Sequence, residues 1–110
     1  MAKRSQEQLL LDVLESCIKI KTYTTGLNYA AFASDDKTID AVIRNLQIIG
    51  EAVNRMSDEE KEQHPQIDWF AIRGLRNRVV HDYMGISLPL IWEIISVDIP
   101  DLQSKIEKIV

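Results

Sequence analysis

Residues 5–23 repeat apolar side chains at the spacing of an amphipathic α-helix. The positions that share one side of this helix are Leu10, Val13, Leu14, Cys17, Ile18 and Lys21. The run Thr24-Thr25-Gly26 predicts the end of the helix, because glycine is favoured just past a last helical turn. Residues 28–33 then predict a short helical link to the next element.

Residues 36–55 carry a nearly ideal helical pattern. Ser34 and Asp35 supply capping oxygens before it, and Asp36 places negative charge in its first turn. Its apolar positions alternate steps of three and four: Ile39, Val42, Ile43, Leu46, Ile49, Gly50 and Val53. A glycine in mid-helix costs about 1 kcal/mol against alanine. We interpret Gly50 as a point where another helix approaches closely.

Two further helices are predicted after this one. Ser57 is a good N-cap for a short, exposed helix that stops before Pro65. Residues 69–84 form the next helix, and Gly85 is placed as its C-terminal stop. The helix at 69–84 contains the residues that could take part in catalysis or in binding a phosphate.

The last helix begins after Ser87, where Pro89 is tolerated in the first turn. Pro100 either kinks this helix or divides it from a terminal segment. No stretch alternates apolar and polar residues in the manner of a strand. The pattern as a whole predicts an all-α bundle of four or five helices.

Length and composition predict one soluble domain over residues 1–110. Apolar residues make up 45% and charged residues 27% of the chain, with no apolar run long enough for a membrane span. The N-terminus lacks a signal-peptide cleavage pattern, so we expect a cytoplasmic protein without a membrane partner. The single cysteine, Cys17, lies on an apolar helix stripe and is interpreted as a core residue.

The net charge of -4 argues against broad, sequence-blind binding to a long nucleic acid. Positive charge is nevertheless concentrated locally, because residues 73–82 hold three arginines against one aspartate. A small basic cleft with a limited footprint on a nucleic acid is therefore compatible with the acidic remainder.

The predicted helix at 69–84 gathers polar residues of a particular kind on one face. On a helical wheel Arg73, Arg76, Asn77 and His81 fall within about 140°, beside a core-facing stripe of Ile72, Leu75 and Val79. Arginine offers phosphate a planar fork of donors, and histidine exchanges protons near neutral pH. Arg76 and His81 are about 7.5 Å apart along the helix axis, a reach suited to one phosphate and its neighbouring sugar.

The chemistry that fits this face is metal-free RNA cleavage. The ribose 2′-hydroxyl attacks the adjacent phosphorus, while His81 acts as general acid or base and Arg76 neutralises the phosphorane. Such cleavage usually employs two proton-transfer groups, and we interpret His64, in a polar linker, as a solvent-exposed bystander. A two-fold dimer would supply two copies of His81 to one cleft, so we expect a homodimer.

Less specific readings of the same residues remain open. Arg76 and His81 could be a surface pair without chemistry, and His81 could be a cation favoured by the helix C-terminus. A metal site is not expected, because the chain has too few histidines for a metal-dependent phosphohydrolase. Arg44 and Glu51, seven residues apart, form a second stripe on the 36–55 helix, either as ion pairs that hold the 69–84 helix or as part of an RNA cleft or dimer contact.

The segment Gly74-Leu75-Arg76-Asn77-Arg78-Val79-Val80-His81-Asp82-Tyr83 resembles the Arg-x-x-x-x-His-x-Tyr signature of HepT-like toxins in the HEPN (higher eukaryotes and prokaryotes nucleotide-binding) superfamily. The resemblance extends to residues 40–46, residues 48–52, Trp69 with Ile72, and residues 92–94 with 98–100. It therefore covers nearly the whole chain and implies an all-α HEPN bundle that forms a homodimer around the motif.

The resemblance also implies a metal-independent ribonuclease toxin, with tRNA or mRNA as substrate and no cofactor. Arg76 and His81 match the catalytic pair, Asn77 matches the polar residue after the arginine, and Arg73 is expected to help seat the RNA backbone. Tyr83 matches the tyrosine that the partner antitoxin, a minimal nucleotidyltransferase (MNT), modifies with AMP in related systems. The rival interpretation is a non-catalytic HEPN module, in which the same cleft binds a nucleotide or a protein without turnover.

Overall fold

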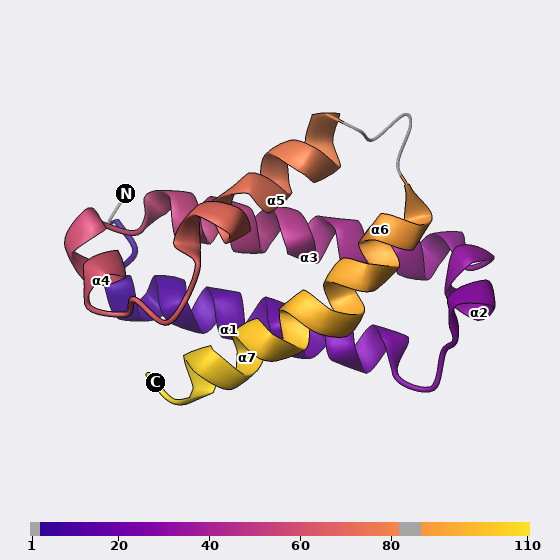
Figure 1. Cartoon of the computed structure of the whole chain (residues 1–110), viewed down its shortest axis with the longest axis horizontal. Helices are drawn as coiled ribbons and strands as arrows, with labels where there is room; N and C mark the ends of the chain where they lie inside the picture. Colours follow the sequence, from indigo (N-terminus) through magenta and orange to yellow (C-terminus); the bar gives the residue numbers. More distant parts are fainter. Residues whose placement is uncertain (1–2, 82–86) are drawn as a thin grey trace.

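The computed structural model describes residues 3–81 and 87–110, and for residues 76–81 it describes the helical backbone without the side chains. The described residues form an all-α bundle, which confirms the fold class predicted from the sequence (Figure 1). Its helices are α1 (Gln6–Thr24), α2 (Tyr29–Ala33), α3 (Asp36–Arg55), α4 (Asp58–Glu62), α5 (Trp69–His81), α6 (Leu88–Glu93) and α7 (Ile99–Glu107).

The long helices α1 and α3 run antiparallel and form the base of the bundle (Figure 1). Ser5 begins α1 with a capping box, in which its hydroxyl accepts the Gln8 amide and the Gln8 side chain accepts the Ser5 amide. Asp35 begins α3 by accepting the Thr38 amide at 3.1 Å and the Thr38 hydroxyl at 2.7 Å. These hydrogen bonds hold the pKa of the Asp35 carboxyl below its usual value.

The core lies where α1, α3, α5 and α7 meet. All the apolar positions predicted for α3 are buried, which confirms that stripe; they are Ile39, Val42, Ile43, Leu46, Ile49, Gly50 and Val53. Cys17 is fully buried, as predicted, and burial raises the pKa of its thiol to about 12. The thiol is therefore a packed, protonated core group at neutral pH.

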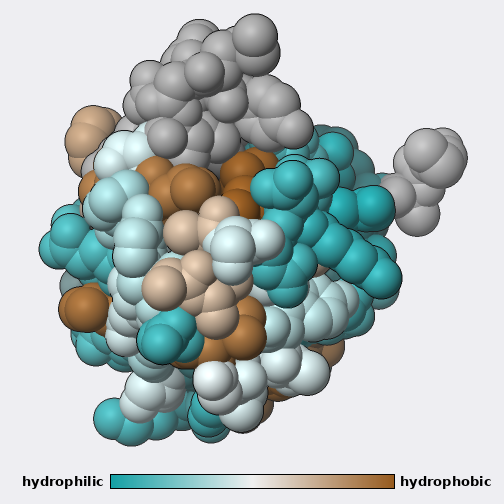
Figure 2. Space-filling view, turned by 90° about the vertical axis from the view of Figure 1, so that its right-hand side faces the viewer, coloured by the Kyte–Doolittle hydropathy of each residue, from teal (hydrophilic) through white to brown (hydrophobic). Residues whose placement is uncertain are grey.

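An aromatic cluster closes one end of the bundle, where α2 meets α6. The Trp92 ring stands edge-on to Tyr29 with centroids 6.3 Å apart, and its centroid lies 5.2 Å from that of the buried Phe32. Figure 2 views this end of the molecule, where hydrophobic residues lie down the middle of the face and hydrophilic residues gather along its right-hand side.

Helices α6 and α7 follow one another through a π-helical turn at Ile94–Asp98. Pro100 lies in the first turn of α7, and the π-helical turn runs into that helix with αR backbone at Asp98. The wider turn before it lets the chain continue along α7 in the same general direction (Figure 1). The sequence left open whether Pro100 kinks the last helix or divides it. In the structure the chain changes from α-helix to π-helix before Pro100 and returns to α-helix at Ile99.

The other predicted boundaries agree closely with the structure. Helix α2 follows the N-cap Asn28, α4 follows the N-cap Ser57, and α6 follows the N-cap Ser87 with a proline in its first turn. The helix expected over 69–84 is described as far as His81, and its predicted stop at Gly85 lies outside the described residues. Among the described helices, none is both long enough and apolar enough to cross a membrane.

Candidate functional site

The start of α5 is anchored by Trp69. Its side chain is 9% exposed, and the indole Nε1–H donates to the carbonyl oxygens of Lys61 at 3.0 Å and His64 at 3.1 Å. One residue earlier, the Asp68 carboxylate accepts the Ala71 amide at 3.1 Å and caps the first turn. These bonds tie the α4–α5 connection to the helix and set the point from which α5 leaves the bundle.

One side of α5 packs on the core through the residues predicted for it. Leu75 is 5% exposed, and Ile72 is half-buried against the core cluster. The third predicted position, Val79, has its side chain outside the described residues. Helix α5 packs against α3 along this side, while Phe70 and Arg73, on another side of its first turns, are exposed.

The backbone of α5 holds the four polar positions of the predicted site in one continuous helix. Arg73 has an exposed side chain, as expected for a residue that would contact RNA. The side chains of Arg76, Asn77 and His81 lie outside the described residues, so their roles stay predictions. Tyr83 falls within residues 82–86, which are also outside the described part of the chain.

Phe70, in the first turn of α5, is a feature that the sequence reasoning missed. Its ring is 87% exposed, whereas the adjacent Trp69 is 9% exposed. Both residues are aromatic, and apolar residues near a helix start are usually read as core. The helical wheel was the available signal, because it places Phe70 at about 120° from Arg76, on the same side as Asn77 and His81.

Arg44 and Glu51 lie on the outer side of α3, and both are exposed. Arg44 borders a hollow of about 490 Å³ between α1 and α3, together with Lys19, Tyr23 and Asn45. Glu51 lies two turns further along α3, and it makes an interaction with another group of the protein. Whether these two residues brace α5 or serve an RNA cleft stays a prediction.

His64 is not the fully exposed bystander expected from its polar linker. Its side chain is 18% exposed, and its Nε2 lies 3.7 Å from a carboxylate oxygen of Glu60. The reason is the indole of Trp69, which binds the His64 carbonyl and draws the linker onto the bundle. His64 nevertheless lies in the connection before α5, at the opposite end of that helix from His81.

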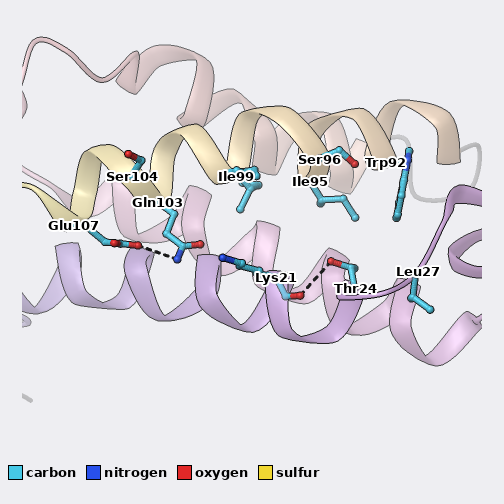
Figure 3. Close-up of a pocket in the computed structure, with 11 residues that line it drawn as sticks. Lys21, Thr24, Leu27, Trp92, Ile95, Ser96, Ile99, Gln103, Ser104 and Glu107 are labelled. Atoms are coloured by element: carbon cyan, nitrogen blue, oxygen red, sulfur yellow. Dashed lines mark hydrogen bonds between the residues drawn. The ribbon is translucent and has the colours of Figure 1, made fainter.

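Two further hollows lie away from the polar side of α5. One, of about 460 Å³, runs between the end of α1 and the π-helical and α7 segments, where the Gln103 amide donates to the Glu107 carboxylate at 2.9 Å and Lys21 lies beyond it on α1 (Figure 3). The other, of about 220 Å³, separates α5 from α7 and is bordered by Asp68, Asp98 and Asp101. Within the described part of the chain, no cluster of histidine, cysteine, aspartate and glutamate could hold a metal ion.

Comparison with known proteins places the chain in a family. A family model described as "Ribonuclease HepT-like" matches residues 13–109. A Thermococcus cleftensis protein named "Probable ribonuclease HepT" is 36% identical over 107 residues, which cover 97% of this chain and 97% of that protein.

Two Methanocaldococcus jannaschii proteins extend the match. "Putative RNase MJ0127" is 34% identical over 110 residues, which cover 100% of this chain and 91% of that protein. "Putative RNase MJ1380" is 36% identical over 107 residues, which cover 97% of this chain and 98% of that protein. No solved structure gives a significant match. The protein described here belongs to the HepT-like ribonuclease family.

Proposed function

We propose that this protein is the toxin of a HepT–MNT toxin–antitoxin pair, of the type II or type VII kind, and acts as a metal-independent endoribonuclease. The observation that carries the proposal is the continuous backbone of α5, which holds Arg76 and His81 on one helix. The bonds at Trp69 fix where that helix begins. Membership of a ribonuclease family supports RNA as the substrate.

The proposed reaction is an internal transfer at phosphorus. The 2′-oxygen of a ribose forms a bond to the adjacent phosphorus, and the bond from phosphorus to the departing 5′-oxygen breaks. His81 takes the proton from the 2′-hydroxyl or gives one to the 5′-oxygen, and Arg76 offsets the charge that builds on the phosphorane. The products are a 2′,3′-cyclic phosphate and a free 5′-hydroxyl. Asn77 would orient the imidazole or a phosphate oxygen, and Arg73 would hold the RNA backbone.

A homodimer would complete the site, because one chain does not offer two histidines within reach of one phosphate. His64 lies beside the Trp69 indole, and His81 is 12 residues further along α5, which corresponds to about 18 Å of helix. His64 therefore cannot be the second proton-transfer group for the same phosphate. A second copy of His81, related by a two-fold axis, would supply it.

Regulation would act through Tyr83. An AMP group transferred to its hydroxyl by a nucleotidyltransferase antitoxin would add bulk and negative charge beside the cleft. Both effects oppose RNA binding, since the phosphate backbone of the RNA carries the same sign of charge. The proposal therefore includes two macromolecular partners, the antitoxin and a second copy of this chain.

The test is cleavage of labelled tRNA and mRNA by the purified protein in excess EDTA. We expect fragments with 2′,3′-cyclic phosphate ends from the wild type, and none from His81→Gln or Arg76→Ala that remain folded and dimeric. His64→Gln is the matched control, because it removes the chain's other histidine, and it should cleave normally. Cleavage by His81→Gln at the wild-type rate would refute the catalytic assignment. RNA binding without cleavage by unmodified wild type would favour the non-catalytic HEPN module.

A further inference from the structure

Phe70 presents an almost fully exposed aromatic ring at the start of the helix that carries the candidate site. The ring is 87% exposed, more than any other large apolar side chain in the described part of the protein. The next residue along, Ala71, is also exposed, so nothing from the bundle folds over this edge of the first turn. The structure itself therefore gives the ring no packing role.

The position of Phe70 on α5 connects it to the site. Residues 70, 74, 77 and 81 follow one another at steps of four, three and four, and residue 73 lies three after residue 70, which places all five on one side of the helix. Arg73, one turn after the ring, is exposed and adds a positive charge. A Cβ placed on Gly74 would meet no atom within 4 Å, so the surface beside the ring is low and open.

We propose that Phe70 is a base-stacking residue, which holds an unpaired nucleobase of the RNA that is cleaved at Arg76 and His81. This inference rests on the proposed ribonuclease function. Helix geometry separates Phe70 from Arg76 by about 9 Å and from His81 by about 16 Å along the axis. The ring therefore reaches a base on a neighbouring nucleotide and not the ribose that is attacked. Arg73, between them, would bind the intervening phosphate.

A nucleobase fits this surface better than a second copy of the chain does. A single aromatic side chain buries about 150–250 Å², whereas a stable dimer needs about 800 Å² from each partner. The low surface at Gly74 leaves space for a flat ring system to lie against the phenyl ring. Stacking also tolerates every base, so Phe70 would strengthen binding without selecting a sequence.

The experiment measures binding of uncleavable RNA to the intact protein. The probes are single-stranded 2′-O-methyl oligonucleotides around a mapped cleavage site, with 2-aminopurine at successive positions. The variants are Phe70→Ala, Phe70→Leu, which keeps apolar bulk without a ring, and Phe70→Tyr, which restores an aromatic ring. Val97→Ala is the matched control, because Val97 is 61% exposed on the π-helical turn and is not part of the proposed site.

We expect wild type and Phe70→Tyr to quench 2-aminopurine at one position, and Phe70→Ala and Phe70→Leu to bind roughly tenfold more weakly without quenching. Val97→Ala should behave as wild type, and every variant should keep its dimer and its melting temperature. Equal binding by Phe70→Ala and wild type, with cleavage intact, would overturn the stacking role alone. Loss of the dimer in Phe70→Ala would overturn it by assigning the ring to a contact between copies. Absence of RNA binding by wild type would overturn both this inference and the ribonuclease proposal.

Discussion

Replacement of Asn45 by leucine should stabilise the protein, because the structure leaves one end of this buried amide unpaired. Asn45 is 5% exposed in the middle of α3. Its Nδ2 donates to the Ala41 carbonyl at 2.9 Å, and this bond fixes the orientation of the amide. Its Oδ1 is buried and has no donor among the described residues. Leucine has a similar size and removes the unpaired oxygen.

The expected gain follows from three contributions. Relief of a buried, unsatisfied oxygen is worth about 1–3 kcal/mol, and loss of the bond to Ala41 costs about 1 kcal/mol. Leucine also has the better helix propensity, by about half a kcal/mol. The free energy of unfolding should therefore rise by about 0.5–2.5 kcal/mol. For a domain of about 100 residues, each kcal/mol corresponds to about 4–8 °C in Tm.

Urea denaturation at a fixed protein concentration measures this change, since the proposed dimer would make the stability depend on concentration. Asn54→Leu is the matched control, because Asn54 is exposed on the same helix and reports the propensity contribution alone. A lower stability for Asn45→Leu would refute the reasoning. It would mean that Oδ1 accepts a hydrogen bond from a group that occupies the hollow beside Arg44. If Asn45→Leu also abolished the proposed dimer, that donor would belong to the second copy.

Three further predictions concern groups elsewhere in the bundle. Gly74→Ala should raise the free energy of unfolding by about 0.5–1 kcal/mol, because the added methyl meets no atom within 4 Å and alanine has the higher helix propensity. A lower free energy of unfolding, measured by urea denaturation, would contradict this. Trp69→Phe should lower the free energy of unfolding by about 1–2 kcal/mol, since the donor to the Lys61 and His64 carbonyls is lost. Unchanged stability in the same measurement would show that the protein does not need this hydrogen bond. Burial raises the pKa of Cys17 from 9.0 to about 12. Above pH 9 the thiol ionises in the unfolded chain before it does in the folded one, so the stability that the buried thiol contributes is complete below pH 9 and falls as the pH rises toward 12. Cys17→Ala should lack this part of the alkaline loss, and the native thiol should resist thiol reagents at pH 8 until urea unfolds the protein; rapid labelling of the folded state would contradict the burial.

Local sequence signals predicted the helices well because the physics of a helix end is local. A capping side chain needs only the amide two or three residues later, as Ser5 with Gln8 and Asp35 with Thr38 illustrate. The apolar stripe of α3 was equally readable, since its spacing depends on helix geometry alone. The family signature on α5 was legible for the same reason, because its residues are close in the chain.

Contacts outside the apolar stripes decided what the stripes did not show. His64 was predicted to be exposed, but the Trp69 indole binds its carbonyl and draws the linker inward. Trp69 and Phe70 are adjacent aromatic residues, and the packing of α5 on the bundle buries the first and leaves the second exposed. The turn at Ile94–Asp98 likewise became π-helical where α6 continues into α7 along the bundle.

By itself, the sequence determined the all-α class, the ends of most helices, the burial of Cys17 and the placement of Arg76 and His81 on one helix. These properties depend on residue type and on spacing within a few turns. The tertiary structure decided how Trp69 anchors the start of α5, how far the His64 side chain is covered, and that Phe70 meets solvent while the adjacent Trp69 is buried. Each of those outcomes depends on which surfaces come together to remove apolar area from water, and the apolar spacing of a single helix does not fix it.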